Sequence, residues 1–145
     1  MPDLNGLHVY SFLPAHARGV ASPGIDPAVG CTLVLGALQW RRLHGPMRLY
    51  ADREFATLIH ELRLEWLYDG GIDTEVLASM PDTIRYDTFW MAPKIFAYGA
   101  ARLPAAFLDV DLVVWRQIPD WQAYGLTVLH PEFNGRGGAT VKCCG

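Results

Sequence analysis

Two aspartates, Asp109 and Asp111, are the residues whose type and spacing most clearly suggest chemistry. They lie in the stretch AAFLDVDLVVW (residues 105–115), between two apolar runs. Such a stretch is typical of a buried strand, and alternation would put both carboxylates on one face, about 7 Å apart. Two like charges in an apolar environment are costly unless something stabilises them. Protonation of one carboxyl group, pairing with cationic side chains or binding of a divalent cation would do so, and Mg²⁺ and Mn²⁺ prefer carboxylate oxygens.

The rest of the chain predicts an α/β fold that could position these carboxylates. Strands are expected at residues 7–13, 47–52, 74–79, 105–115 and 125–133, the third being short or an irregular edge. Helices are expected at residues 27–43, 53–69 and about 88–101, and residues 14–26 are expected to form a loop. Alternation of strands and helices favours a mostly parallel sheet flanked by helices, with ligands at the carboxyl ends of the strands.

Several residues mark the expected helix boundaries. Asp26 before Pro27 has the pattern of an N-cap followed by a first helical residue. Gly70 and Gly71 would end the second helix. Pro93 lies inside the third helical segment, so that helix either begins near Ala92 or is kinked.

Composition limits the class of protein. The chain has 145 residues, 51% hydrophobic and 19% charged, with a net charge of −3, which is typical of one globular domain. No basic stripe suggests nucleic-acid binding, and the apolar runs are shorter than the ~20 residues of a membrane span. No secretory signal is recognisable, so we expect a cytoplasmic protein. Residues 1–133 are expected to form the domain and the glycine-rich residues 134–145 a flexible tail.

The segment FWMAPKIFAYGAARLPAAFLDVDLVVWRQIP (residues 89–119) resembles the nucleotide-sugar-binding core of GT-A-fold, Rossmann-like glycosyltransferases, and most closely those related to bacterial capsule and polysaccharide synthesis. In that family a helix with a basic residue leads into an apolar strand that carries D-x-D. The matching positions are Trp90, Lys94, Ile95, Tyr98, Asp109, Asp111 and Trp115. The likeness is most specific here and extends loosely over about residues 7–130.

The resemblance implies a role for each candidate residue. Asp111, and Asp109 directly or through the ribose, would hold Mn²⁺ or Mg²⁺ against the two phosphates of a nucleotide-sugar donor. Lys94 would offset the charge of the phosphates or of the acidic pair. The remaining candidates for donor binding, through the base or the ribose, are Asp52, Ser11 and Phe12.

Each of these roles has a plainer alternative. Asp109 and Asp111 would be two solvated acids at a strand end, and Lys94 an ordinary solvated lysine. Asp52 would be a helix N-cap. Ser11 and Phe12 would be plain loop residues, while Trp90 and Tyr98 are expected in the core rather than at a site. His130, the only histidine after the D-x-D motif, is a weaker candidate for a further metal ligand.

The sequence therefore predicts a glycosyltransferase-like protein that transfers a sugar from a nucleotide-sugar donor to an unknown acceptor. The chain is shorter than such domains usually are, so the donor half is expected and the acceptor half is not. The alternative is an inactive or truncated remnant that binds a nucleotide-sugar without catalysis. A haloacid-dehalogenase-type phosphatase also uses D-x-D after an apolar strand, but there the motif lies near the N-terminus.

Overall fold

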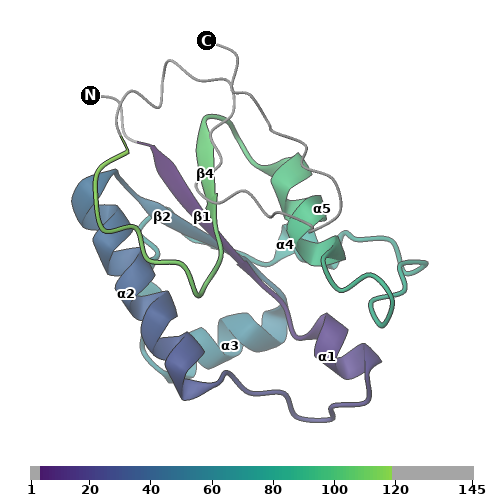
Figure 1. Cartoon of the computed structure of the whole chain (residues 1–145). Coiled ribbons are helices and arrows are strands. Elements are labelled where there is room, and N and C mark those ends of the chain that lie inside the picture. The colour runs from purple at the N-terminus through teal and green to yellow at the C-terminus, as the bar shows by residue number, and fades with distance from the viewer. Residues whose placement is uncertain (1–3, 119–145) are drawn as a thin grey trace, which may run out of the picture.

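The structure is a computed structural model that describes residues 4–118, and it has a four-stranded parallel sheet at its centre (Figure 1). The strands are β1 (Asn5–Tyr10), β2 (Met47–Ala51), β3 (Ile72–Asp73) and β4 (Ala105–Leu108). Their order across the sheet is β3-β2-β1-β4. The predicted α/β class with a parallel sheet is thus confirmed for the described residues.

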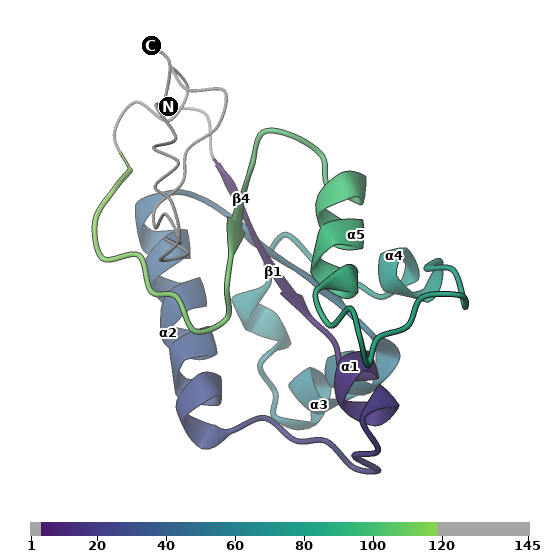
Figure 2. The same ribbon diagram turned by 45° about the vertical axis from the view of Figure 1, so that its right-hand side comes forward.

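Helices cover both faces of the sheet (Figure 2). On one face α2 (Pro27–Leu43) and α3 (Arg53–Glu61) pack against a core that includes Trp40 and Phe55. On the other face α4 (Glu75–Ala78) and α5 (Ala92–Ala100) cover a smaller core that includes Val9 and Ala97. The short α1 (Leu13–Ala17) directly follows β1, and a 3-10 turn, η1 (Glu65–Leu67), follows α3.

Two of the predicted helices have the expected boundaries. Helix α2 begins at Pro27, where the side chain of Asp26 accepts a hydrogen bond from the Ala28 amide, as predicted for an N-cap. Helix α5 begins at Ala92, so Pro93 lies in its first turn, where its missing N–H costs no hydrogen bond. The interpretation of a helix start near Ala92 is therefore confirmed, and no kink is needed.

Three of the predictions made for residues 14–79 are wrong. The loop expected at 14–26 contains most of α1. The second helix ends at Glu61 rather than at Gly70, because Arg63 adopts a positive φ of 55° and the Leu64 amide donates back to the Ile59 carbonyl.

The strand expected at 74–79 is helical instead. The Asp73 carboxylate accepts hydrogen bonds from the amides of Glu75 and Val76 at 3.0 and 3.1 Å, so the chain turns into α4 directly after β3. The predicted strand at 125–133 and the predicted tail at 134–145 lie outside the described residues.

One polar side chain, His8, lies in the core of the sheet. It is fully buried, and its Nδ1 lies 3.2 Å from the Tyr68 hydroxyl. Its Nε2 has no hydrogen-bond partner among the described residues. Burial lowers the pKa of His8 to about 4, so the ring is neutral in the folded protein at neutral pH.

The strand order determines where a ligand would bind. From β1 the chain moves outward to β2 and β3, then returns to place β4 on the opposite side of β1. The direction in which strands are added to the sheet therefore reverses between β1 and β4. In open parallel sheets a crevice forms at this point, and ligands bind there. Within residues 4–118, no helix is long and apolar enough to cross a membrane.

Candidate functional site

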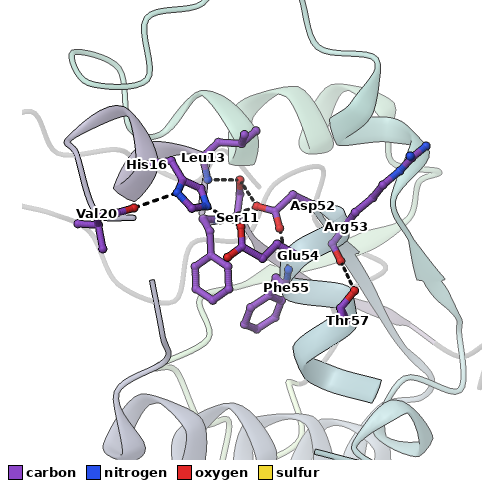
Figure 3. Close-up of polar contacts among 10 residues, drawn as sticks. Ser11, Leu13, His16, Val20, Asp52, Arg53, Glu54, Phe55 and Thr57 are labelled. Atoms are coloured by element: carbon purple, nitrogen blue, oxygen red, sulfur yellow. Dashed lines mark hydrogen bonds and ion pairs between the residues drawn. The ribbon is translucent and has the colours of Figure 1, made fainter. Parts of the chain in front are cut away.

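Asp52 joins the carboxyl ends of β1 and β2 (Figure 3). Its Oδ2 accepts hydrogen bonds from the Ser11 hydroxyl at 2.8 Å and from the Phe12 amide at 2.5 Å. Its Oδ1 accepts from the Phe55 amide at 2.8 Å, which caps the N-terminus of α3. The N-cap alternative for Asp52 is therefore confirmed, and the same carboxylate fixes the turn that follows β1.

Phe12 itself is part of the core. Its side chain is buried, and its ring lies edge-on to Phe55, with ring centroids 5.4 Å apart. Tyr10 stacks on Phe55 at 4.3 Å, and burial, with a smaller effect from Asp52, raises the pKa of Tyr10. This aromatic cluster holds the end of β1 in place. Phe12 has little ring surface left to offer a nucleotide base.

A cavity of about 260 Å³ opens at the carboxyl end of β1, and its lining includes Val110, just beyond the end of β4. One wall is formed by residues 9–12 at the end of β1. A second is formed by residues 13–24, which we call the α1 segment and which include Arg18 and Gly24. The third wall is the start of α5 with Trp90 and Lys94, and Val110 completes the lining. The cavity therefore lies at the crevice that the strand order predicts.

The two aspartates do not lie in a buried strand. Strand β4 ends at Leu108, and the Leu112 amide donates to the Asp109 carbonyl at 2.9 Å, which forms a turn. Val110 is buried, whereas Asp109 and Asp111 are exposed. The strand predicted over 105–115 is confirmed only at residues 105–108, and the premise that both charges are buried among apolar side chains is wrong.

Lys94 forms an ion pair with Asp109, between the first turn of α5 and the end of β4. The Lys94 side chain is 22% exposed and that of Asp109 is 55% exposed. The interpretation of Lys94 as an ordinary solvated lysine is thus wrong, because its ammonium group has a definite partner and its stem lines the cavity. Among residues 4–118, the cavity wall has two cationic side chains, Lys94 and Arg18, and no carboxylate.

The structure brings only some of the predicted residues together. Ser11, Phe12 and Lys94 line the cavity. Asp52 accepts hydrogen bonds from Ser11 and Phe12, and Asp109 forms an ion pair with Lys94. Asp111 is not among the lining residues. His130 lies outside the described residues.

Two aromatic predictions have different outcomes. Tyr98 packs against Phe107 with ring centroids 4.1 Å apart, as expected for a core residue. Burial, and to a lesser extent Asp109, raises the pKa of Tyr98. Trp90 was expected in the core but is 60% exposed and lines the cavity.

Sequence interpretation missed Arg18 as a residue of this cavity. It lies in a segment that was assigned only as a loop, and its side chain is held by a hydrogen bond of 3.1 Å from its Nε to the Pro14 carbonyl. One signal was available, because the segment directly follows the first strand and therefore starts at the ligand-binding edge of the sheet.

The turn formed by residues 109–112, which we call the acidic turn, carries Asp109 and Asp111. Its potential metal ligands can be compared with what a divalent cation needs. Among residues 4–118, no group of three or more acidic, histidine or cysteine side chains is close enough to hold a metal ion. Mg²⁺, however, usually binds through one or two carboxylates and takes its remaining ligands from water and substrate phosphates. Asp109 and Asp111 supply the number of carboxylates that a shared site of that kind uses, which is too few for a site built from protein ligands alone.

Comparison with known proteins adds no further information: no family model, curated protein or solved structure matches this chain.

Proposed function

We propose that this chain binds a nucleotide-sugar donor at the cavity beside the carboxyl end of β1, with Mn²⁺ or Mg²⁺ held at the acidic turn, and that it acts as a glycosyltransferase-like protein. The observation that carries the proposal is the cavity itself, which lies near the switch point of a parallel sheet and has a cationic wall that contacts the exposed carboxylate of Asp109. A diphosphate would be attracted by Lys94 and Arg18. The bound cation would supply charge neutralisation of the departing nucleoside diphosphate.

The size of the cavity limits which part of the donor it can hold. A volume of about 260 Å³ is below the range of roughly 300–1,000 Å³ that is usual for drug-sized ligands. The cavity would therefore enclose one portion of the donor, and the diphosphate would extend over its rim towards Asp109. Trp90, exposed at this rim, offers a flat surface for a base or sugar ring.

The protein's own hydrogen bonds restrict what the β1 end can contribute. The Ser11 hydroxyl and the Phe12 amide already donate to Asp52. A carboxylate has about four acceptor positions, and three of those of Asp52 are used. Asp52 could accept one further hydrogen bond from a ribose or base, and its main role is to position the loop.

Binding without catalysis is the alternative, and one observation favours it. Among the described residues, the cavity wall carries no carboxylate and no histidine that could act as a general base. An assay for sugar release from the donor, with and without candidate acceptors, separates the two cases. Donor binding with no release of nucleoside diphosphate under any condition identifies a binding protein.

The binding test is calorimetric titration with UDP-glucose and GDP-mannose, each with Mn²⁺ and with EDTA. We expect binding that requires the metal and that weakens at least about tenfold in Asp109→Asn and in Asp111→Asn, since even outer-shell partners of a metal contribute that much. Asp82→Asn, which changes an exposed aspartate outside the cavity, is the matched control. Unchanged affinity in both test variants would exclude the metal assignment.

A further inference from the structure

The α1 segment, which forms one wall of the cavity, is held at its far side by one histidine. Helix α1 has only five residues, and the chain leaves it through Gly19 at a φ of 87°. Its backbone hydrogen bonds beyond the helix are local, such as those from the amides of Gly19 and Val20 to the carbonyls of His16 and Ala15. The N-terminal end of this segment is joined to α3 by the hydrogen bond from the Phe12 amide to Asp52, and its C-terminal end is joined to α3 by the side chain of His16.

His16 has a hydrogen-bond acceptor at each ring nitrogen (Figure 3). Nδ1 lies 2.9 Å from the carbonyl oxygen of Val20, and Nε2 lies 2.5 Å from a carboxylate oxygen of Glu54 on α3. A carbonyl and a carboxylate can only accept, so both ring nitrogens must carry a proton to make both bonds. A neutral imidazole has one N–H and can satisfy only one of them.

The charges around His16 favour the protonated ring. Glu54 and Asp52, both at the N-terminal end of α3, are the charged groups that act on it. They raise the pKa of His16, with the hydrogen bond to Glu54 as the largest cause, helped by the Val20 carbonyl and opposed by a smaller effect of desolvation. The side chain remains 34% exposed, so protons exchange freely with the solvent.

We propose that His16 is a positioning residue whose imidazolium form ties the α1 segment to α3 and so fixes one wall of the cavity, and that this wall loosens when the ring loses its proton. Loss of the proton breaks the bond to Val20 or the bond to Glu54. Either break frees the residues just before Gly24, and Arg18 lies between His16 and Val20. The pH of the surroundings would thereby control how well Arg18 is placed.

The sign of the effect follows from the direction of the shift. A histidine whose folded pKa is raised stabilises the folded arrangement below its unfolded value, and this stabilisation is lost as pH rises through the folded value. The α1 segment is therefore best ordered in mildly acid solution. If the proposed function holds, on which this consequence rests, donor binding also weakens as pH rises.

The test follows the ring and the loop separately from any ligand. The pKa of His16 is measured by NMR, and amide protection factors of residues 15–24 are measured by hydrogen exchange between pH 5.5 and 9. We expect protection in this segment to fall at the same midpoint as the His16 titration. In Glu54→Gln the midpoint should move to lower pH, whereas in Glu61→Gln, on the exposed far end of the same helix, it should not move.

Removal of the ring provides the second arm. In His16→Gln the protection of residues 15–24 should be low at every pH, as it is in the wild-type protein at high pH. His60→Gln removes a histidine on α3 instead and should retain the wild-type profile. Protection that does not follow the His16 titration, or a midpoint that Glu54→Gln leaves in place, would overturn the proposal.

The ligand arm uses UDP-glucose and Mg²⁺ at pH 6 and pH 8. A loop that is ordered in only a fraction of molecules weakens apparent affinity by that fraction, and we expect a loss of about threefold or more that His16→Gln abolishes. A pH-dependent loop with no nucleotide binding at either pH supports the role of His16 and overturns the proposed function. Nucleotide binding combined with protection of residues 15–24 that does not change with pH supports the proposed function and overturns the role of His16.

Discussion

Asp52 and Asp109 occupy equivalent places in the fold, yet they differ in almost every physical respect. Each follows the last residue of a strand that pairs directly with β1, Asp52 after β2 and Asp109 after β4. Asp52 is partly buried and accepts three hydrogen bonds from two other segments of the chain. Asp109 has a side chain that is 55% exposed and, among the described residues, a single ion pair with Lys94.

The difference shows that an acidic residue at the ligand-binding edge of a sheet is not by itself a binding residue. The oxygens of Asp52 are largely used by the protein, so the β2 side of the edge is closed and mainly structural. On the β4 side, which we call the open side, Asp109 pairs with the flexible side chain of Lys94. A cation bound to Asp109 or an anion bound to Lys94 would have to break this pair. The more exposed carboxylate therefore lies on the β4 side of β1, and the carboxylate with three hydrogen bonds lies on the β2 side.

The largest effect is expected on the closed side. Asp52→Ala removes the cap of α3 and both contacts to the turn after β1, and we expect it to lower the free energy of unfolding by about 4 kcal/mol, from one cap and two hydrogen bonds to a charged group. Asp26→Ala is the matched control, since Asp26 caps α2 through one recorded hydrogen bond, and it should cost about 1 kcal/mol. Denaturant unfolding measures both. Equal losses in the two variants would mean that the contacts of Asp52 to Ser11 and Phe12 contribute nothing.

A smaller effect is expected where α2 supports the acidic turn. A Cβ on Gly36 would lie 2.7 Å from the Leu112 carbonyl oxygen, so α2 and the segment after β4 approach closely only because residue 36 has no side chain. We expect Gly36→Ala to destabilise the protein by about 2 kcal/mol, as overpacking usually does. It should also shift the NMR signals of residues 109–113.

The control for this variant lies on the same helix. A Cβ on Gly30 meets only Ile25 at 3.9 Å, which is an ordinary contact. Gly30→Ala should therefore stabilise the protein by about 0.5–1 kcal/mol, because alanine loses less backbone entropy on folding. If both alanines stabilise the protein, the acidic turn is not held by α2, and the open side is looser than the structure indicates.

The sequence predicted the framework well where a local signal and the tertiary structure agree. Asp26 and Pro27 start α2 as expected, and the alternation of strands and helices correctly gave a parallel sheet. Predictions failed where one residue overrides the pattern. Arg63 ends α3 in a left-handed conformation that is uncommon for arginine, and Asp73 turns an apparent strand into α4.

The candidate site was predicted in part, for a physical reason. Position along the chain places Ser11, Asp52 and Asp109 at one edge, because parallel strands share their carboxyl ends. Which of these side chains stay available depends on hydrogen bonds between segments far apart in the sequence, such as Ser11 to Asp52 across 41 residues. No local pattern encodes such bonds, so the closure of the β2 side could not be predicted, nor could the exposure of Trp90.

The smallest effect is expected on the open side, and it tests the comparison most directly. Lys94→Met and Asp109→Asn should each change the free energy of unfolding by less than about 1 kcal/mol, and their coupling in a double-mutant cycle should be equally small, because an ion pair with an exposed carboxylate gains little over hydration. A coupling of 3 kcal/mol or more would place this pair in the same class as the contacts of Asp52. The pair would then be structural, and the free energy needed to break it would prevent a diphosphate or a cation from taking the place of either partner. A coupling near zero, measured together with the large loss in Asp52→Ala, would mean that the β4 side can exchange its partners while the fold stays intact.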